Sequence, residues 1–318
     1  MTQASDDIDI LVSEVGPRDG LQSIARVMPT AAKLRWIAAL AASGVREIEV
    51  GSFVSPRLLP QMADTAELVR EAVRIPGLGV LALVPNLKGA ERAIAAGCPK
   101  LTMPVSASQS HSMKNVGMTT EAATAEVARI CAFRASLPTE RRPGLEVGVS
   151  TAFGCTIEGP VSEDAVIRLA VALAAAGADT VGLSDTTGYG NPAQVRRLFT
   201  RLRQELGALA GGAHFHNTRG QGLANVVAAL EVGVTTFDSS QAGLGGCPYA
   251  PGATGNIVTE DLVFLLEAMG LRTGIDIPKL VAARALIEEG LPGEPLYGHV
   301  PSAGLPIGFH PAVAGSVA

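Results

Sequence analysis

Residues Gly79–Val105, GVLALVPNLKGAERAIAAGCPKLTMPV, hold the pattern that decides the fold. A short apolar run over Gly79–Val84 stops at a proline. Residues 87–96 then have the character of a helix that ends at Gly97, since glycine commonly terminates helices. A second short apolar run, Leu101–Val105, comes next. The stretch therefore predicts a strand, a helix and a strand in series, the repeating unit of a parallel sheet.

The same alternation runs along most of the chain. Eight short runs are bounded by Gly or Pro, and several are rich in Val, Ile or Leu. The predicted strands are Ile10–Val15, Glu47–Val50, Gly79–Val84, Leu101–Val105, Leu145–Ser150, Thr180–Leu183, Ala213–His216 and Thr235–Asp238. The predicted helices between them are Ala31–Ala42, Ala63–Arg74, Leu87–Ala96, Thr120–Ala135, Glu163–Ala176, Pro192–Leu206, Gly222–Glu231 and Asn256–Met269. Eight such units without a change in composition favour a closed (β/α)8 TIM barrel, in the α/β class, over an open sheet.

The chain continues past the eighth unit. We expect residues 1–274 to form the barrel and residues 275–318 to form a C-terminal extension packed on it. The extension should hold one more helix, near Pro278–Glu289, followed by a Gly- and Pro-rich run. Its sequence fits three roles: covering the barrel mouth, taking part in a dimer, or only packing.

Composition argues against several classes of protein. The net charge of −5 and the lack of a basic stripe argue against a nucleic-acid partner. The longest apolar run, 169–178, is too short to cross a bilayer, so no membrane partner is expected. The first ten residues, MTQASDDIDI, are acidic and lack the apolar segment of a secretion signal. None of the four cysteines forms a CxxC pair, and we expect a soluble, reduced, cytoplasmic protein.

Polar residues gather after the predicted strands, where barrel enzymes carry their chemistry. His214 and His216 lie two apart in one strand and therefore point to the same face. They can share a metal ion or simply hydrogen-bond inside the barrel. Asp19 can supply an anionic ligand or cap the turn after the first strand, and Asn256 can supply a neutral oxygen or cap the last helix. Two imidazoles and two oxygens, without a thiolate, favour Mg²⁺ or Mn²⁺ over structural zinc.

Further candidates surround these ligands. Arg18 can stabilise a developing oxyanion, and it can also pair with Glu49, which ends the second strand. Ser52 follows that strand and is a candidate substrate contact. Gln22 can bind substrate or cap the first helix. Asp185 follows the sixth strand and can support a metal ligand, contact substrate or form a turn.

Residues Ser239–Asn256, SSQAGLGGCPYAPGATGN, combine many glycines with one cysteine. Structural cysteines usually lie in apolar runs, but Cys247 lies between Gly246 and Pro248. We interpret the segment as a loop over the reacting centre. The thiol of Cys247 is then a candidate for proton transfer.

Six motifs identify a family. They are VGPRDGLQ, SFVSPRLLPQMAD, PNLKG, FGCTIEG, HFHNTRGQGLAN and AGLGGCPYAPGATGN followed by TEDLV. Together they closely resemble the 3-hydroxy-3-methylglutaryl-CoA lyase family, which belongs to a superfamily of metal-dependent TIM-barrel lyases and synthases. The resemblance runs from about Ile10 to about Gly274, and the cysteine-loop motif is long and specific.

The resemblance implies a role for each matching residue. Asp19, His214, His216 and Asn256 match the metal ligands, Arg18 the arginine that stabilises an enolate, Glu49 and Asp185 two active-site acids, and Cys247 the loop cysteine. The implied reaction is retro-Claisen cleavage of a 3-hydroxyacyl-CoA to acetyl-CoA and a keto acid, acetoacetate for the namesake substrate. The resemblance also implies a homodimer and a place in leucine degradation.

Two departures from the family pattern bear on the substrate. The lyases usually carry Asp after the HxH motif, whereas Asn217 stands here, as it often does in the condensing synthases. Asn217 is therefore a candidate substrate contact. Residues 104–119 include His111 where the family has other residue types, and this segment can line the acyl pocket. The alternatives to the namesake lyase are a lyase for citramalyl-CoA or a longer 3-hydroxy-3-alkylglutaryl-CoA, a Claisen-condensing acyltransferase, and a barrel without activity.

Overall fold

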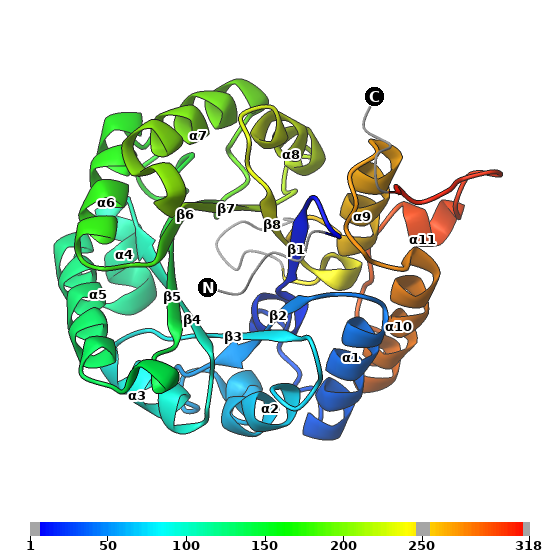
Figure 1. Cartoon of the computed structure of the whole chain (residues 1–318), viewed down its shortest axis with the longest axis horizontal. Helices are drawn as coiled ribbons and strands as arrows, with labels where there is room; N and C mark the ends of the chain where they lie inside the picture. Colours follow the sequence, from blue (N-terminus) through cyan, green and yellow to red (C-terminus); the bar gives the residue numbers. More distant parts are fainter. Residues whose placement is uncertain (1–6, 246–254, 314–318) are drawn as a thin grey trace.

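The computed structural model describes residues 7–245 and 255–313. Eight parallel strands pair in chain order, and the last strand pairs with the first to close a barrel (Figure 1). The strands are β1 (Leu11–Glu14), β2 (Glu47–Ser52), β3 (Gly79–Leu83), β4 (Lys100–Ser106), β5 (Gly144–Ser150), β6 (Thr180–Asp185), β7 (Ala210–Phe215) and β8 (Thr236–Ser239). All eight predicted strands are present, which confirms the (β/α)8 barrel.

Helices surround the barrel as an outer ring (Figure 1). They are α1 (Thr30–Ala42), α2 (Thr65–Ala72), α3 (Leu87–Ala95), α4 (Gln109–Val116), α5 (Thr120–Ala135), α6 (Glu163–Ala175), α7 (Pro192–Leu206), α8 (Gly222–Leu230) and α9 (Thr259–Ala268). Every predicted helix is present, whereas α4 was not expected. Helix α4 begins because Ser108 accepts the amide of His111, and it ends at Gly117 in the left-handed conformation.

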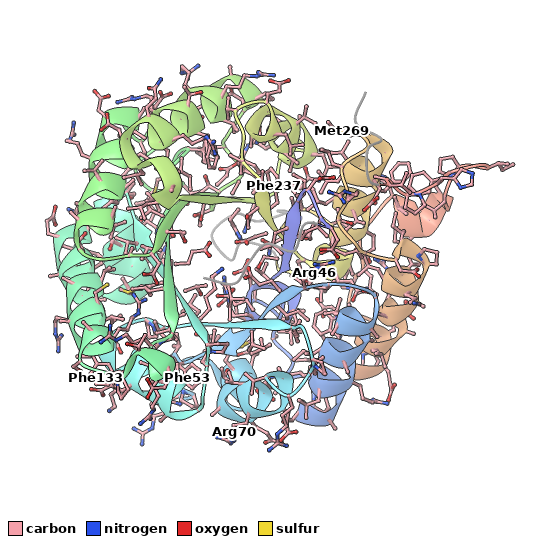
Figure 2. All side chains as sticks on the ribbon, viewed as in Figure 1. Arg46, Phe53, Arg70, Phe133, Phe237 and Met269 are labelled. Carbon is pink, nitrogen blue, oxygen red and sulfur yellow. The ribbon has the colours of Figure 1, made fainter. Side chains whose placement is uncertain are left out.

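Alternation along the strands separates the core from the interior of the barrel. Apolar residues such as Phe237 on β8 face the helices and are fully buried, whereas Arg70 on α2 lies at the outer edge (Figure 2). The inward residues are largely polar. Lys100 lies 3.1 Å from Glu47 and 2.8 Å from Glu146. Many barrels fill this space with branched apolar side chains, whereas here small residues such as Ser13, Gly148 and Ser184 line a cavity.

The chain beyond the barrel forms α10 (Ile277–Gly290) and the short α11 (Val300–Ala303). Helix α10 lies beside α1 and α9 on the outside of the barrel (Figure 1). Asp261 on α9 accepts the amides of His299 and Val300, which fixes the start of α11. Within the described residues, no helix combines the length and apolar character needed to cross a membrane.

Candidate metal centre and active site

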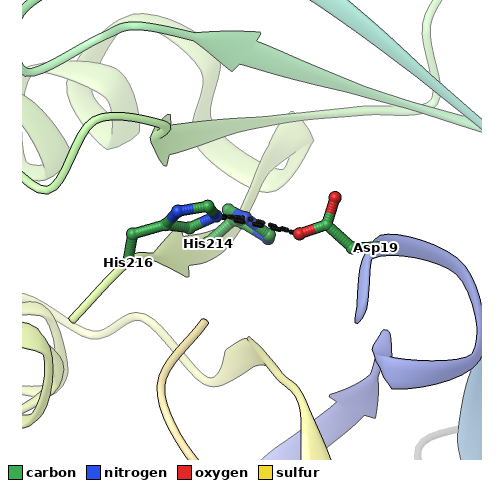
Figure 3. Close-up of side chains that lie close together, drawn as sticks. All are labelled: Asp19, His214 and His216. Atoms are coloured by element: carbon green, nitrogen blue, oxygen red, sulfur yellow. Dashed lines mark hydrogen bonds and ion pairs between the residues drawn. The ribbon is translucent and has the colours of Figure 1, made fainter. Parts of the chain in front are cut away.

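The end of β7 brings two imidazoles together. Nε2 of His214 and Nε2 of His216 lie 3.1 Å apart, as the two-residue spacing on one strand predicts. Both nitrogens face Oδ2 of Asp19, at 3.9 Å from His214 and 3.7 Å from His216 (Figure 3). One ligand atom from each residue lies within 4.8 Å of the others. These three side chains therefore converge closely enough to hold one cation.

Asp238 on β8 orients the first histidine. The register of the two strands places His214 beside Asp238, and Oδ2 of Asp238 lies 3.0 Å from Nδ1 of the imidazole. A proton on Nδ1 leaves the lone pair of Nε2 directed at Asp19, as a metal ligand requires. Burial alone would lower the pKa of His214, but Asp238 and Asp19 outweigh it and raise that pKa. Asp238 was not among the predicted site residues, although it ends the predicted strand Thr235–Asp238.

Asp19 lies in the single π-helical turn Gly16–Gly20 that follows β1. Its Oδ1 accepts hydrogen bonds from Nη1 of Arg18 at 2.5 Å and from Nε2 of Gln22 at 2.6 Å. Its Oδ2 accepts one from Nδ2 of Asn256 at 2.7 Å. Burial opposes ionisation, but Arg18 and the two histidines hold the pKa of Asp19 below its usual range. Asp19 is thus an ionised carboxylate whose Oδ2 faces the two imidazoles.

Asn256 does not cap the last helix of the barrel. Helix α9 begins at Thr259 with Val258 at the N-cap position, because residues 256 and 258 instead form bridges with His216 and Ser240. The helix-cap alternative for Asn256 is therefore wrong. Among the residues that the structure describes, Oδ1 of Asn256 is buried without a hydrogen-bond partner. A cation would satisfy this oxygen, and two imidazoles with two oxygen donors fit Mg²⁺ or Mn²⁺.

Arg18 links the candidate metal centre to a second acid. Its Nε donates to Oε2 of Glu49, and Thr102 donates to the other oxygen of Glu49. Glu49 is only 2% exposed. Burial raises the pKa of Glu49, against the opposing effects of Arg18 and Thr102. Two carboxyl groups in the cavity therefore differ in their pKa values. Asp19 stays ionised, whereas Glu49 accepts a proton more readily than Asp19 does.

A cavity of about 880 Å³ connects these groups. Arg18, Asp19, Gln22, Glu49, His214, His216 and Asp238 line it. Leu58 and Leu59 add apolar wall from the segment after β2, and His111 and Lys114 of α4 also line the cavity. His111 is nearly buried, with Nδ1 at 3.1 Å from Oγ of Ser106, and burial lowers its pKa. The cavity has the size and mixed lining of a small-molecule site.

Four of the predicted residues that the structure describes are not in the cavity lining: Asn256, which reaches it through its bond to Asp19, and Ser52, Asn217 and Asp185. Ser52 accepts the amide of Val54 through its hydroxyl, and Asn217 accepts the amide of Gly222 at 2.9 Å. The carboxylate of Asp185 accepts the amides of Tyr189 and Gly190, which fits the turn-forming alternative. Burial raises the pKa of Asp185. Their parts in catalysis or substrate binding stay predictions.

Cys247 lies outside the described residues. The chain on either side of that segment is described, and Gly245 contributes to the cavity wall. A Cβ atom on Gly255 would lie 2.2 Å from the carbonyl oxygen of Gly245. The segment that carries Cys247 therefore starts and ends at the candidate metal centre, beside Asn256.

Comparisons with known proteins agree with this site. The family model described as HMGL-like matches residues 9–287. The chain is 40% identical over 289 residues to a hydroxymethylglutaryl-CoA lyase of Bacillus subtilis (strain 168), covering 90% of this chain and 94% of the relative. It is 39% identical over 284 residues to a mitochondrial hydroxymethylglutaryl-CoA lyase of Bos taurus, covering 89% and 86%.

A solved structure is similar over nearly the whole chain. It is an HMG-CoA lyase of Acinetobacter baumannii in complex with coenzyme A and 3-methylmalate. The TM-score is 0.88 at 39% identity, over 98% of this chain and 99% of that one. With its barrel, its converging histidines and aspartate, and these relatives, the chain belongs to the HMGL-like family.

Proposed function

We propose that this protein is a divalent-metal-dependent lyase that cleaves 3-hydroxy-3-methylglutaryl-CoA to acetyl-CoA and acetoacetate. The observation that carries the proposal is the convergence of Asp19, His214 and His216 at one cavity, with Asn256 bonded to Asp19 and with Arg18 and Glu49 in the cavity wall. The relatives at about 40% identity are named for this activity. The similar structure that holds coenzyme A supports an acyl-CoA substrate.

The four ligands would hold Mg²⁺ or Mn²⁺, which supplies Lewis-acid polarisation of substrate oxygens when bound. Asp238 bonds to Nδ1 of His214 and so keeps the lone pair of Nε2 available to bind the metal ion. Arg18 and Gln22 bind Oδ1 of Asp19 and leave Oδ2 facing the histidines. The protein thus fixes three donors before any ligand arrives, which reduces the reorganisation needed on binding.

Cleavage needs a base at the tertiary hydroxyl and an acid at the departing carbon. Burial raises the pKa of Glu49, a carboxyl group in the cavity wall. We assign Glu49 the role of the base that accepts the proton of the substrate hydroxyl. As the C2–C3 bond breaks, the alkoxide becomes a ketone and the bonding electrons pass into the thioester enolate. Arg18 lines the cavity beside Glu49 and stabilises that oxyanion. Cys247 then protonates C2 of the enolate, as the family motif implies.

The relatives favour the namesake substrate over the alternatives. Asn217 was the residue that argued for a condensing synthase, but its amide oxygen bonds to the start of α8. Neither citramalyl-CoA nor a longer 3-alkyl substrate is favoured by an observed contact. A homodimer and a role in leucine degradation are further proposals, which rest on the family resemblance. A cytoplasmic location is a further proposal, which rests on the composition of the sequence.

The test is a panel of CoA thioesters with the purified protein, treated with EDTA and then reloaded with Mg²⁺ or Mn²⁺. We expect 3-hydroxy-3-methylglutaryl-CoA to give the highest kcat/KM, with acetyl-CoA and acetoacetate released in equal amounts. The chelated protein should be inactive until metal is restored. A preference for citramalyl-CoA or a longer 3-alkyl compound would overturn the substrate assignment. Release of CoA from acetyl-CoA plus a 2-oxo acid, without cleavage, would overturn the reaction.

A further inference from the structure

The turn Gln241–Gly243, directly after β8, has a strained backbone. Ala242 has φ +60°, in the left-handed region that residues other than glycine seldom adopt. It is fully buried. A strained residue persists only where its surroundings hold it in place. Since the next residues lead to Gly245 at the cavity wall, the contacts that hold this turn bear on the candidate metal centre.

Those contacts come in large part from the C-terminal extension. The amide of Ala242 donates to the carboxylate of Glu260 at 3.1 Å, and its carbonyl accepts the amide of Tyr297 at 2.8 Å. The side-chain amide of Gln241 donates to the carbonyl of Leu280 on α10. Tyr297 and Leu280 both lie beyond the barrel, so the extension binds the turn at two successive residues.

Arg284 on α10 joins these contacts into one unit. Its Nη1 lies 2.8 Å from Oε1 of Glu260 and 2.8 Å from the carbonyl oxygen of Tyr297. The side chain of Glu260 is 0% exposed, so Arg284 supplies the positive charge that a buried carboxylate needs. Without Arg284, Glu260 would have to protonate or move, and the amide of Ala242 would lose a charged acceptor.

The residues on either side of the turn, Ser240 and Leu244, are bonded to the segment that carries Asn256. The amide of Ser240 donates to the carbonyl of Ile257 at 3.0 Å, and Nδ2 of Asn256 lies 3.4 Å from the carbonyl oxygen of Leu244. Glu14 of β1 accepts the amide of Gln241 at 2.9 Å and the hydroxyl of Thr259 at 2.7 Å. A shift of the turn therefore shifts the backbone on both sides of Asn256.

We propose that the C-terminal extension is a positioning element for the metal centre, in which Arg284 acts through Glu260 and the Gln241–Gly243 turn on Asn256. This rests on the proposed function, since that function makes Asn256 a metal ligand. Within the described part of the chain, Arg284 is not in the cavity lining, and its hydrogen bonds go to Glu260 and Tyr297 and not to the four ligands. Its contribution is to keep the amide oxygen of Asn256 in place before the cation binds, as residues behind metal ligands commonly do.

The test measures Mn²⁺ binding by the full-length protein without substrate, from the free-Mn²⁺ signal in electron paramagnetic resonance. For Arg284→Met we expect the Mn²⁺ Kd to rise about tenfold, the lower end of the effect of losing a residue behind a ligand. Arg284→Lys keeps the charge and should fall between Arg284→Met and wild type. At saturating Mn²⁺, the activity of Arg284→Met should return toward wild type, which general damage to the structure would prevent.

Arg272→Met is the matched control. Like Arg284→Met, it removes an arginine that pairs with a carboxylate, but Arg272 bonds to Asp9 and not to the turn or to Glu260. Its Mn²⁺ Kd should equal that of wild type. An unchanged Kd in folded Arg284→Met, or in Arg284→Lys if only that variant folds, would overturn the positioning role. If wild type itself fails to bind Mn²⁺, both this inference and the proposed function are overturned.

Discussion

Nδ1 of His214 lies 3.0 Å from Oδ2 of Asp238, while Nε2 of the same ring faces Nε2 of His216. The carboxylate thus acts on the imidazole from the side away from the candidate metal centre. We expect Asp238→Asn to weaken Mn²⁺ binding by about 10- to 100-fold, since the neutral amide polarises the ring less. Titration of the Mn²⁺ resonance signal measures this. Asp164→Asn, an exposed aspartate paired with Arg201, is the control, and equal Kd values in the two variants would contradict the role.

Glu49→Gln separates proton transfer from metal binding. Glu49 is not among the four candidate ligands, so the Mn²⁺ Kd should stay close to wild type. We expect kcat to fall by about 100-fold or more, the usual effect of losing a general base. Glu47→Gln is the control on the same strand: Glu47 bonds to Lys100, which keeps Glu146 as a second partner. Equal losses of kcat in both variants would mean that the loss in Glu49→Gln comes from removing a buried carboxylate from the strand, and would contradict its role as the base.

Cys247→Ser tests the thiol that the sequence places in the loop. We expect kcat to fall by about 100-fold, because a hydroxyl is a much poorer proton donor at neutral pH than a thiol. The Mn²⁺ Kd and the unfolding midpoint should not change, since the thiol is not in the donor set. Cys131→Ser, on α5 in the outer ring, is the control. Unchanged steady-state kinetics in Cys247→Ser would make the thiol incidental.

Glu14→Gln tests a buried acid that the reaction does not use. Burial raises the pKa of Glu14 from 4.5 to about 8. Between these values the folded protein holds a proton that the unfolded chain has lost, so stability falls as pH rises. The slope for this one group is at most about 1.4 kcal/mol per pH unit. Urea unfolding of wild type and Glu14→Gln from about pH 5 to pH 8 should show wild type losing stability relative to the variant. A constant difference would contradict the raised pKa.

The order of strands and helices was predictable because each unit resembles Gly79–Val105, with short apolar runs and helices that end at glycine. Helix α4 was not predicted, because Ser108–Gly117 is too polar to show an amphipathic period. What starts and stops this helix is its capping by Ser108 and Gly117, which is a local signal but a short one.

The ligands on one strand were predictable, because spacing alone fixes which way His214 and His216 point. Asp238 was not, because its contact depends on the register between β7 and β8, which the sequence does not state. The sequence also could not decide whether Asn256 binds a metal ion or caps the last helix. Whether its side chain caps a helix depends on where that helix starts, and bridges to His216 and Ser240 delay the start to Thr259.

Gly245 and Gly255 lie so close that a methyl group on the second would meet the carbonyl oxygen of the first. Nine residues separate these two glycines in the sequence, so the two described ends that this segment joins lie at a single point of the barrel. If another sequence of similar length replaced these nine residues, the entropic cost of closing the loop would stay about the same, because that cost depends mainly on loop length. These two glycines are thus the natural crossover points for chimeras with other members of the family. Such chimeras would change what the loop contributes to the chemistry while keeping the same metal-binding barrel beneath it.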